Sequence, residues 1–305
     1  SRVQKRFLGI DWNLFKRTLT DRSGVLVFGG WADINSILLI HICILLKRKY
    51  LFWTDTPDTE RKRNKYFAFA RSLFLKRAMK NAYAVLATGA PAVSALGRMG
   101  VHEHKIVNFP YWVDVDLYAP QLSRESSHLK STIRFVSSGR VLNYLKGHDV
   151  AIRSIAKAAK RIPSADFEYS IAGTGPDAEK LEDLARQLGI GDKVRILGWV
   201  EPDKLIEVLH KSDGLIHPSP IHEPYGVAVI EAMAAGMTVL ASDATCAGLD
   251  RILHGVNGFI HEAGNPDSLA DQIELLLKHP DRMIEMSTNA RKTATQWPVS
   301  RGVAI

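Results

Sequence analysis

The chain has 305 residues, 46% of them apolar, which is typical of two ordinary domains that each bury a core and excludes a disordered or fibrous chain. Charge is divided unevenly: residues 1–130 hold 21 Lys and Arg against 10 Asp and Glu, whereas residues 131–305 hold 19 against 22. The basic first part predicts an anionic surface or acceptor as its partner. It carries no RNA-recognition, zinc-finger or helix-turn-helix signature, so we expect no nucleic acid.

Cysteine and hydropathy patterns indicate the compartment. Cys43 and Cys246 are too few for a disulfide framework and lack metal-ligand spacing, which predicts core positions in a reducing environment. Residues 1–6 contain no apolar core of a signal peptide. The longest apolar run, residues 37–46, is far shorter than the roughly 20 residues that span a bilayer. We therefore expect a cytoplasmic protein that is soluble or peripheral on the inner face of the membrane.

The N-terminal part alternates short apolar runs with helical patterns. Strands are expected at residues 25–28, 50–54 and 84–88, and helices at 14–19, 35–46 and 91–99. This order predicts a parallel sheet whose functional loops follow the carboxyl ends of its strands. Gly29 and Gly30 follow the first of these strands, and Asp55 follows the second.

Residues 60–81 mix clusters of Lys and Arg with Phe, Leu and Met, as a basic amphipathic helix does. Two interpretations are open. The helix is either an ordinary surface helix with a solvated basic face or a contact with an anionic membrane surface. Each basic residue near an anionic leaflet adds roughly 1 kcal/mol to such a contact.

The second part of the chain repeats the alternation. Strands are expected at residues 132–136, 169–172, 194–197, 214–217 and 238–241, and helices at 148–159, 178–188, 203–210, 227–235 and 268–277. The polar stretch 117–131 contains Pro120 and separates the two parts. We therefore expect two α/β domains joined by a linker.

Residues 218–236 combine a loop, a helix start and two carboxylates. The loop carries Glu223 to the tip of the strand 214–217. At the helix start, the unpaired N–H groups of Gly226 and Val227 favour an anion such as a phosphate. A carboxylate one turn into the helix, such as Glu231, can accept two hydrogen bonds from a vicinal diol such as ribose.

A second candidate site follows the strand 132–136. Gly139 lets the chain turn beside a ligand, and Arg140 and Lys146 lie six residues apart in the same loop, where both can converge on one anion. Two solvated surface cations are the alternative. Arg140 and Lys146 follow a strand, and a pair of carboxylates lies downstream of them. Both observations favour the anion site.

Glu223 and Glu231, which lie eight residues apart around Pro-Tyr-Gly, resemble the E-x7-E motif of the retaining, family-four glycosyltransferases of GT-B architecture. The resemblance covers residues 132–297 and, less closely, about 24–118. It implies an α/β fold with two Rossmann-like parallel-sheet domains that face each other across a cleft. Residues 1–23 resemble no part of the family, so the N-terminal domain is expected to be truncated or reduced, without the family's first strand and glycine loop.

The resemblance also implies a division of the chain. Residues 1–120 form the acceptor-side domain, residues 121–131 the linker, residues 132–295 the nucleotide-sugar-binding domain, and residues 296–305 a tail that crosses back.

The resemblance then implies roles for single residues. Arg140, Lys146 and the N–H groups of Gly226 and Val227 would stabilise the charge on the diphosphate leaving group. Glu231 would hold the ribose, and Glu223 would meet the sugar. Further donor contacts are implied for Gly139, Gly173, Trp199, Val200 and Tyr225. The family often places a sugar-contacting histidine where this chain has Asp55, so Asp55, Gly29 and Gly30 are expected to contact sugar or acceptor.

The implied reaction is retaining transfer of a sugar from a UDP- or GDP-sugar to a glycan or lipid-linked hydroxyl, in polysaccharide or glycoconjugate biosynthesis. The nucleotide sugar is a substrate, and no cofactor is expected. No Asp-x-Asp pair suited to hold Mg²⁺ on a diphosphate is present, so no metal site is expected. The alternatives are a degenerate nucleotide-binding GT-B protein without turnover and a GT-B epimerase or phosphorylase.

Overall fold

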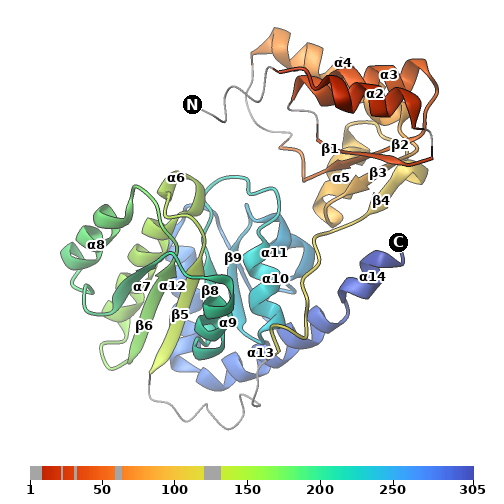
Figure 1. Cartoon of the computed structure of the whole chain (residues 1–305). Coiled ribbons are helices and arrows are strands. Elements are labelled where there is room, and N and C mark those ends of the chain that lie inside the picture. Colours follow the sequence, from red (N-terminus) through yellow and green to blue (C-terminus); the bar gives the residue numbers. More distant parts are fainter. Residues whose placement is uncertain (1–8, 22, 31–32, 59–63, 120–131) are drawn as a thin grey trace. The chain divides into compact units, whose positions relative to one another are not determined.

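The computed structural model describes residues 9–21, 23–30, 33–58, 64–119 and 132–305, apart from the side chain of Phe67. The chain divides into two compact units, Ser1–Tyr111 and Trp112–Ile305, and each contains one parallel sheet with helices packed against it (Figure 1). The predicted linker, residues 1–8, Trp31 and the beginning of the predicted basic helix before Asn64 lie outside the described residues.

The first unit has a four-stranded parallel sheet in the order β1-β2-β3-β4. Its strands are β1 (Leu26–Gly29), β2 (Tyr50–Thr54), β3 (Ala84–Ala87) and β4 (Ile106–Asn108). Its helices are α2 (Trp12–Thr20), α3 (Ile34–Leu45), α4 (Lys65–Asn81), α5 (Ala90–Arg98) and the 3₁₀ helix η1 (Glu103–Lys105). Gly29 pairs with Trp53, so the chain leaves β1 and β2 at the same edge of the sheet.

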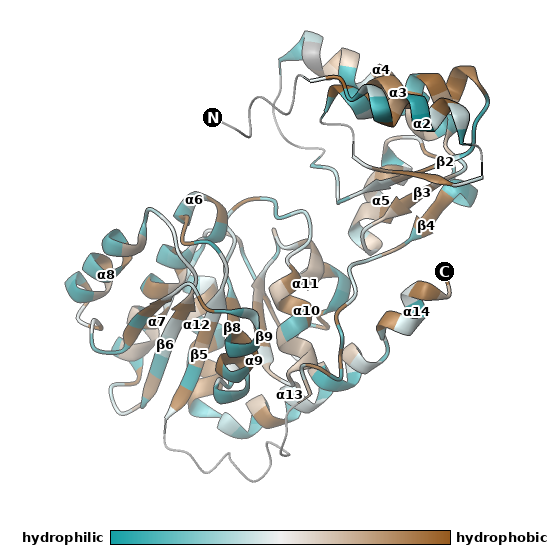
Figure 2. Ribbon diagram, in the orientation of Figure 1, coloured by the Kyte–Doolittle hydropathy of each residue, from teal (hydrophilic) through white to brown (hydrophobic). Residues whose placement is uncertain are grey.

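The core of this unit forms between β2 and the helices α3 and α4. Tyr50 and Phe52 are completely buried, and the Tyr50 hydroxyl donates a hydrogen bond of 2.5 Å to the carbonyl of Ala78 in α4. Helix α3 is apolar over much of its length (Figure 2), and Ile40 and Cys43 on it are also fully buried. Burial of these side chains accounts for an apolar run that is too short to be a membrane span.

The second unit has a six-stranded parallel sheet in the order β10-β9-β8-β5-β6-β7. Its strands are β5 (Ile133–Ser138), β6 (Phe167–Ala172), β7 (Val194–Gly198), β8 (Gly214–His217), β9 (Thr238–Ser242) and β10 (Gly258–His261). Its helices are α6 (Asn143–Lys146), α7 (His148–Arg161), α8 (Ala178–Gln187), α9 (Pro202–Lys211), α10 (Val227–Ala234), α11 (Cys246–Arg251), α12 (Pro266–Lys278), α13 (Pro280–Thr295) and α14 (Val299–Val303).

The strand order of the second sheet reverses between its two central strands. From β5 the chain proceeds to β6 and β7 on one side, and it then returns to β8, β9 and β10 on the other. Strands β5 and β8 are direct neighbours, with Phe135 opposite Gly214 and Val136 opposite Leu215. Open α/β sheets bind ligands beyond the carboxyl ends of the strands at such a reversal.

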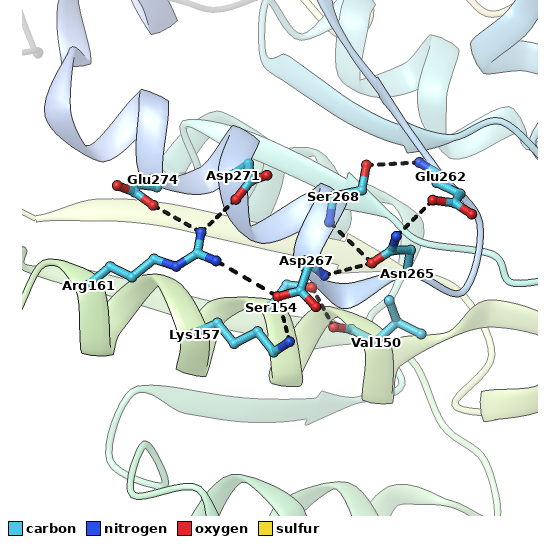
Figure 3. Close-up of polar contacts among 10 residues, drawn as sticks. All are labelled: Val150, Ser154, Lys157, Arg161, Glu262, Asn265, Asp267, Ser268, Asp271 and Glu274. Carbon is cyan, nitrogen blue, oxygen red and sulfur yellow. Dashed lines mark hydrogen bonds and ion pairs between the residues drawn. The ribbon is translucent and has the colours of Figure 1, made fainter.

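Helices α7 and α12 are joined by ion pairs on the surface of the second unit (Figure 3). Arg161 on α7 donates to Asp271 at 2.6 Å and to Glu274 at 3.0 Å, both on α12. Lys157 donates to Asp267 at 2.6 Å. These side chains are partly to largely exposed, so each pair adds little to stability.

Several short elements are absent from the expected pattern, among them α6, which lies in the predicted loop of Arg140 and Lys146, and α11 and β10. These three are only four to six residues long. Short elements carry little periodic signal, and tertiary contacts decide their conformation. Strand β10, for example, exists because Phe259 pairs with Leu240 of β9.

Other features agree with the sequence. Cys43 and Cys246 are both buried, as predicted. Among the helices that the structure describes, none is long and apolar enough to cross a bilayer.

Candidate functional site

The loops after β5 and β8 meet at the reversal of the second sheet. The first loop leads through Gly139 and Arg140 to α6, which ends at Lys146. The second leads through Glu223 to Gly226, and α10 starts at Val227. The Lys146 ammonium group donates a hydrogen bond to Glu223, which ties the two predicted loops together.

Glu223 is held by three side chains. Besides Lys146 on Oε1, its Oε2 atom lies 2.9 Å from Nε2 of His217 and accepts a hydrogen bond from the hydroxyl of Ser219. The Glu223 side chain is only 13% exposed, and the His217 side chain only 4%. The carboxylate is therefore fixed in position by partners on the strand end, the loop and the neighbouring helix.

The surroundings of Glu223 keep it ionised. Burial alone would raise the pKa of its carboxyl group, because a charged carboxylate loses water contacts. The hydrogen bond and charge of His217, together with those of Lys146, outweigh burial and hold the pKa of Glu223 well below its usual range.

Gly226 opens α10 in a conformation that other residues adopt at a cost, with φ at +99°. A Cβ atom at this position would lie 2.8 Å from Cγ2 of Thr245 and 3.2 Å from Nε2 of His217. No side chain caps α10 within the described part of the chain. The helix start thus offers backbone N–H groups beside the fixed carboxylate, as the sequence predicted.

Glu231 lies one turn into α10, and the structure supplies a partner that the sequence did not reveal. The hydroxyl of Tyr118 donates to Oε1 of Glu231 at 2.9 Å. Burial raises the pKa of Glu231, and the hydrogen bond from Tyr118 works in the opposite direction without cancelling it. Glu231 is therefore a carboxyl group with a hydroxyl partner already in place.

The loops after β5 and β6 touch through their backbones. A Cβ atom on Gly173 would lie 1.8 Å from the carbonyl oxygen of Gly139, so only glycine fits there.

The Arg140 side chain is exposed, while its carbonyl accepts a hydrogen bond of 3.1 Å from Nε2 of His148. Burial lowers the pKa of His148 to about 4, so at neutral pH the ring is uncharged and its Nε2–H donates.

The remaining predicted donor contacts lie apart from the Glu223 network. Trp199 is 70% exposed after the edge strand β7, and its indole N–H donates to Glu201 at 2.8 Å. Val200 beside it is half-buried. The ring of Tyr225 is buried, and its hydroxyl donates to Asp250 of α11 at 3.2 Å. Tyr225 therefore supports the loop from inside, and its carbonyl accepts a hydrogen bond of 2.7 Å from the N–H of Ala247.

The predicted contacts in the first unit gather at one edge of its own sheet. Gly29 ends β1, and Gly30 follows it with a φ of +102°. Asp55 follows the neighbouring strand β2 and accepts a hydrogen bond of 3.0 Å from the hydroxyl of Tyr111. Burial, with a smaller effect from Asp55, raises the pKa of Tyr111 to about 12, so this hydroxyl keeps its proton.

Sequence reasoning missed several supporting residues. His217 carried a usable signal, because a titratable side chain ended a strand that was otherwise apolar. Ser219 and Tyr118 carried none, because serine is common in loops and Tyr118 lies 113 residues from Glu231. Among the described residues, no group of His, Cys, Asp and Glu is arranged to hold a metal ion.

A parallel sheet that reverses its strand order, with a buried carboxylate and a helix start at the reversal, defines an open α/β fold with a candidate ligand site at that place. Residues 120–293, more than half of the chain, match the model of the glycosyl transferases group 1 family. The chain therefore belongs to this family, and the resemblance to the retaining, family-four enzymes is confirmed.

Relatives with similar sequences carry glycosyltransferase names. An uncharacterised glycosyltransferase of Methanocaldococcus jannaschii is 37% identical over 152 residues, which cover 50% of this chain and 37% of the relative. The D-inositol 3-phosphate glycosyltransferase of Corynebacterium aurimucosum is 27% identical over 291 residues, which cover 92% of this chain and 66% of the relative. The chain thus spans less than two thirds of the length of either relative.

Solved structures confirm the predicted GT-B fold class. The Anabaena protein HepE, crystallised in complex with UDP, has a TM-score of 0.77 at 20% identity, and the match covers 95% of this chain and 79% of HepE. The lipopolysaccharide outer core galactosyltransferase WaaB has a TM-score of 0.71 at 17% identity, and the match covers 94% of this chain and 74% of WaaB. At these identities the similarity concerns the fold.

Proposed function

We propose that this protein transfers a sugar from a nucleotide diphosphate sugar to a hydroxyl acceptor, with retention of the anomeric configuration. The observation that carries the proposal is the fixed carboxylate of Glu223, joined to Lys146 and placed beside the start of α10. A cation and free N–H groups suit a diphosphate, and a carboxylate next to them suits the hydroxyl groups of a sugar.

In the proposed reaction the bond between the anomeric carbon and the diphosphate oxygen breaks, and a bond to the acceptor oxygen forms on the same face of the sugar. The acceptor proton passes to the leaving phosphate. Arg140, Lys146 and the N–H group of Val227 stabilise the charge that develops on the diphosphate. Glu231 holds the ribose. A ribose hydroxyl can replace the hydroxyl of Tyr118 as the hydrogen-bond donor to the Glu231 carboxylate.

We infer that the donor is a UDP-sugar. HepE has also been crystallised in complex with UDP-glucose, with a TM-score of 0.72 against this chain. A GDP-sugar is the alternative, and a comparison of UDP and GDP affinities by calorimetry distinguishes the two.

For the acceptor, we infer a hydroxyl on a glycan or a lipid-linked sugar. The name of one similar protein mentions an inositol phosphate, whose phosphate group carries negative charge. The basic residues 1–130 would complement such an acceptor. Residues 1–120 would then receive the acceptor at the inner face of the membrane, and residues 132–295 would bind the donor.

The test is a transfer assay with UDP-glucose and a panel of glycan and lipid-linked acceptors. Arg140→Ala, Lys146→Ala and Glu231→Ala should each lower turnover by a factor of about 10²–10³. Lys180→Ala, which removes an exposed lysine of α8, is the matched control and should have wild-type turnover.

Each other outcome identifies an alternative. Wild-type rates in all three variants would refute the site assignment. UDP binding without turnover on any acceptor would favour a degenerate nucleotide-binding protein, and a product formed without acceptor would favour an epimerase or phosphorylase.

A further inference from the structure

Helix α4 of the first unit exposes an apolar stripe to solvent. Tyr66, Phe69 and Leu73 follow one another at helical spacing and are 88%, 72% and 62% exposed. The opposite side of the same helix packs into the core, where Leu75 and Met79 are buried. The helix therefore has apolar side chains on both faces, and only one of these faces is used by the fold.

The exposed stripe becomes basic toward the end of the helix. Lys76, Arg77 and Lys80 lie three, four and seven residues after Leu73, on the same side of α4, and all are exposed. Every ion pair found among the described residues lies in the second unit. Within the part of the chain that the structure describes, Lys76, Arg77 and Lys80 belong to none of these ion pairs.

A pocket of about 310 Å³ lies at the end of this stripe. Lys76, Lys80, His102 and Lys105 line it, together with apolar residues. The ammonium group of Lys105 donates to the carbonyls of Lys80 and Ala82, at 2.5 Å and 2.8 Å, and so stays at the pocket wall. Three lysines around one small space create a site for a phosphate group.

We propose that the exposed face of α4 binds a bilayer surface that contains anionic phospholipid. Tyr66, Phe69 and Leu73 enter the interfacial region, and the lysine pocket receives a phosphate headgroup. A membrane accounts for the whole face, because aromatic and aliphatic side chains favour the headgroup boundary while the lysines favour its charge. A soluble polyanion would use the lysines and leave the apolar stripe in water. This binding is independent of the donor site, so it goes beyond the proposed transfer reaction.

The test is co-sedimentation of the chain with vesicles, either of phosphatidylcholine alone or of phosphatidylcholine with an equal amount of phosphatidylglycerol. Only the anionic vesicles should bind the wild-type chain. Lys76→Glu/Lys80→Glu and Phe69→Ser/Leu73→Ser should each weaken binding at least about tenfold. Lys211→Glu and Val303→Ser, at exposed positions of the second unit, are the matched controls for charge and for apolar area and should bind like the wild type. Circular dichroism before sedimentation establishes that each variant is folded.

Two results would overturn the proposal. One is equal binding to neutral and anionic vesicles, or binding to neither. The other is wild-type vesicle binding by Phe69→Ser/Leu73→Ser. If that variant also binds heparin or glycerol phosphate as the wild type does, the face recognises soluble phosphate or sulfate groups. A wild-type chain that binds neither kind of vesicle but transfers sugar to a soluble acceptor would refute this inference alone and leave the transfer reaction standing.

Discussion

Glu223 joins chain segments that are distant in sequence. Its partners come from the end of β8, the following loop and the end of α6. Because the folded-state pKa of Glu223 lies below the unfolded value of roughly 4.3, its stabilising contribution is present above that pH and is lost as the pH falls through the lowered pKa. At neutral pH the network is therefore fully formed.

His217 should be a positioning residue for Glu223. In His217→Ala the buried carboxylate loses a partner, so the free energy of unfolding should fall by about 1–3 kcal/mol. Turnover should fall more than UDP affinity, because the nucleotide contacts remain. Calorimetry and a transfer assay measure the two effects, and the conservative His217→Gln should restore part of the turnover. Equal losses of affinity and turnover would contradict a positioning role.

The raised pKa of Glu231 predicts a pH dependence of nucleotide binding. Glu231 must be ionised to accept two ribose hydrogen bonds, so affinity for UDP should increase as the pH rises through its raised pKa. The free energy of unfolding changes in the opposite sense. A carboxyl group whose pKa is raised in the folded state contributes stability below its unfolded-state pKa, and this contribution is lost as the pH rises through the folded-state pKa.

Calorimetry across the acidic range measures this effect. UDP phosphates also titrate, so Glu231→Gln provides the reference: the ratio of wild-type to variant affinity should rise with pH. A ratio that is constant with pH would contradict the role of Glu231.

At the scale of elements, the start of α10 depends on Gly226. An alanine there must adopt a positive φ, which costs about 1–2 kcal/mol, and its Cβ would press on Thr245 and His217. Gly226→Ala should therefore displace Glu223 and the first N–H groups of α10, and UDP affinity should fall at least about tenfold. Gly189→Ala, a glycine of positive φ with open space around it, controls for backbone strain alone. Equal affinities in the two variants would show that close packing at Gly226 does not matter.

Much of the element pattern could be predicted from the sequence. Strands β2 and β8 have the predicted bounds, because each is a short apolar run that ends at polar residues. The carboxylate pair and the glycine at the helix start were also predictable, since their chemistry depends on neighbours in sequence. The partners of Glu223 and Glu231 were not, because contacts such as that of Tyr118 depend on how distant segments pack.

At the scale of the molecule, the two units should contribute separately to the reaction. Asp55 and its partner Tyr111 lie in the first unit, whereas the nucleotide contacts that we propose lie in the second. Asp55→Asn should therefore lower turnover about tenfold, as expected for the loss of one hydrogen bond to a bound sugar, and leave UDP affinity unchanged. Glu103→Gln, an exposed carboxylate of η1 in the same unit, should change neither quantity. A loss of UDP affinity in Asp55→Asn would refute this division.

If the protein binds a nucleotide sugar as we propose, the Lys146–Glu223 ion pair makes donor binding an exchange of partners. An arriving diphosphate competes with Glu223 for the same ammonium group, so part of the attraction between lysine and phosphate replaces an attraction that already existed. The displaced carboxylate is then buried with fewer partners, and sugar hydroxyl groups are the donors that can satisfy it. The binding free energy of a complete nucleotide sugar should consequently be more favourable than the sum of the binding free energies of the free nucleotide and the free sugar. The site would thus discriminate against free nucleotide and favour the molecule it is to cleave.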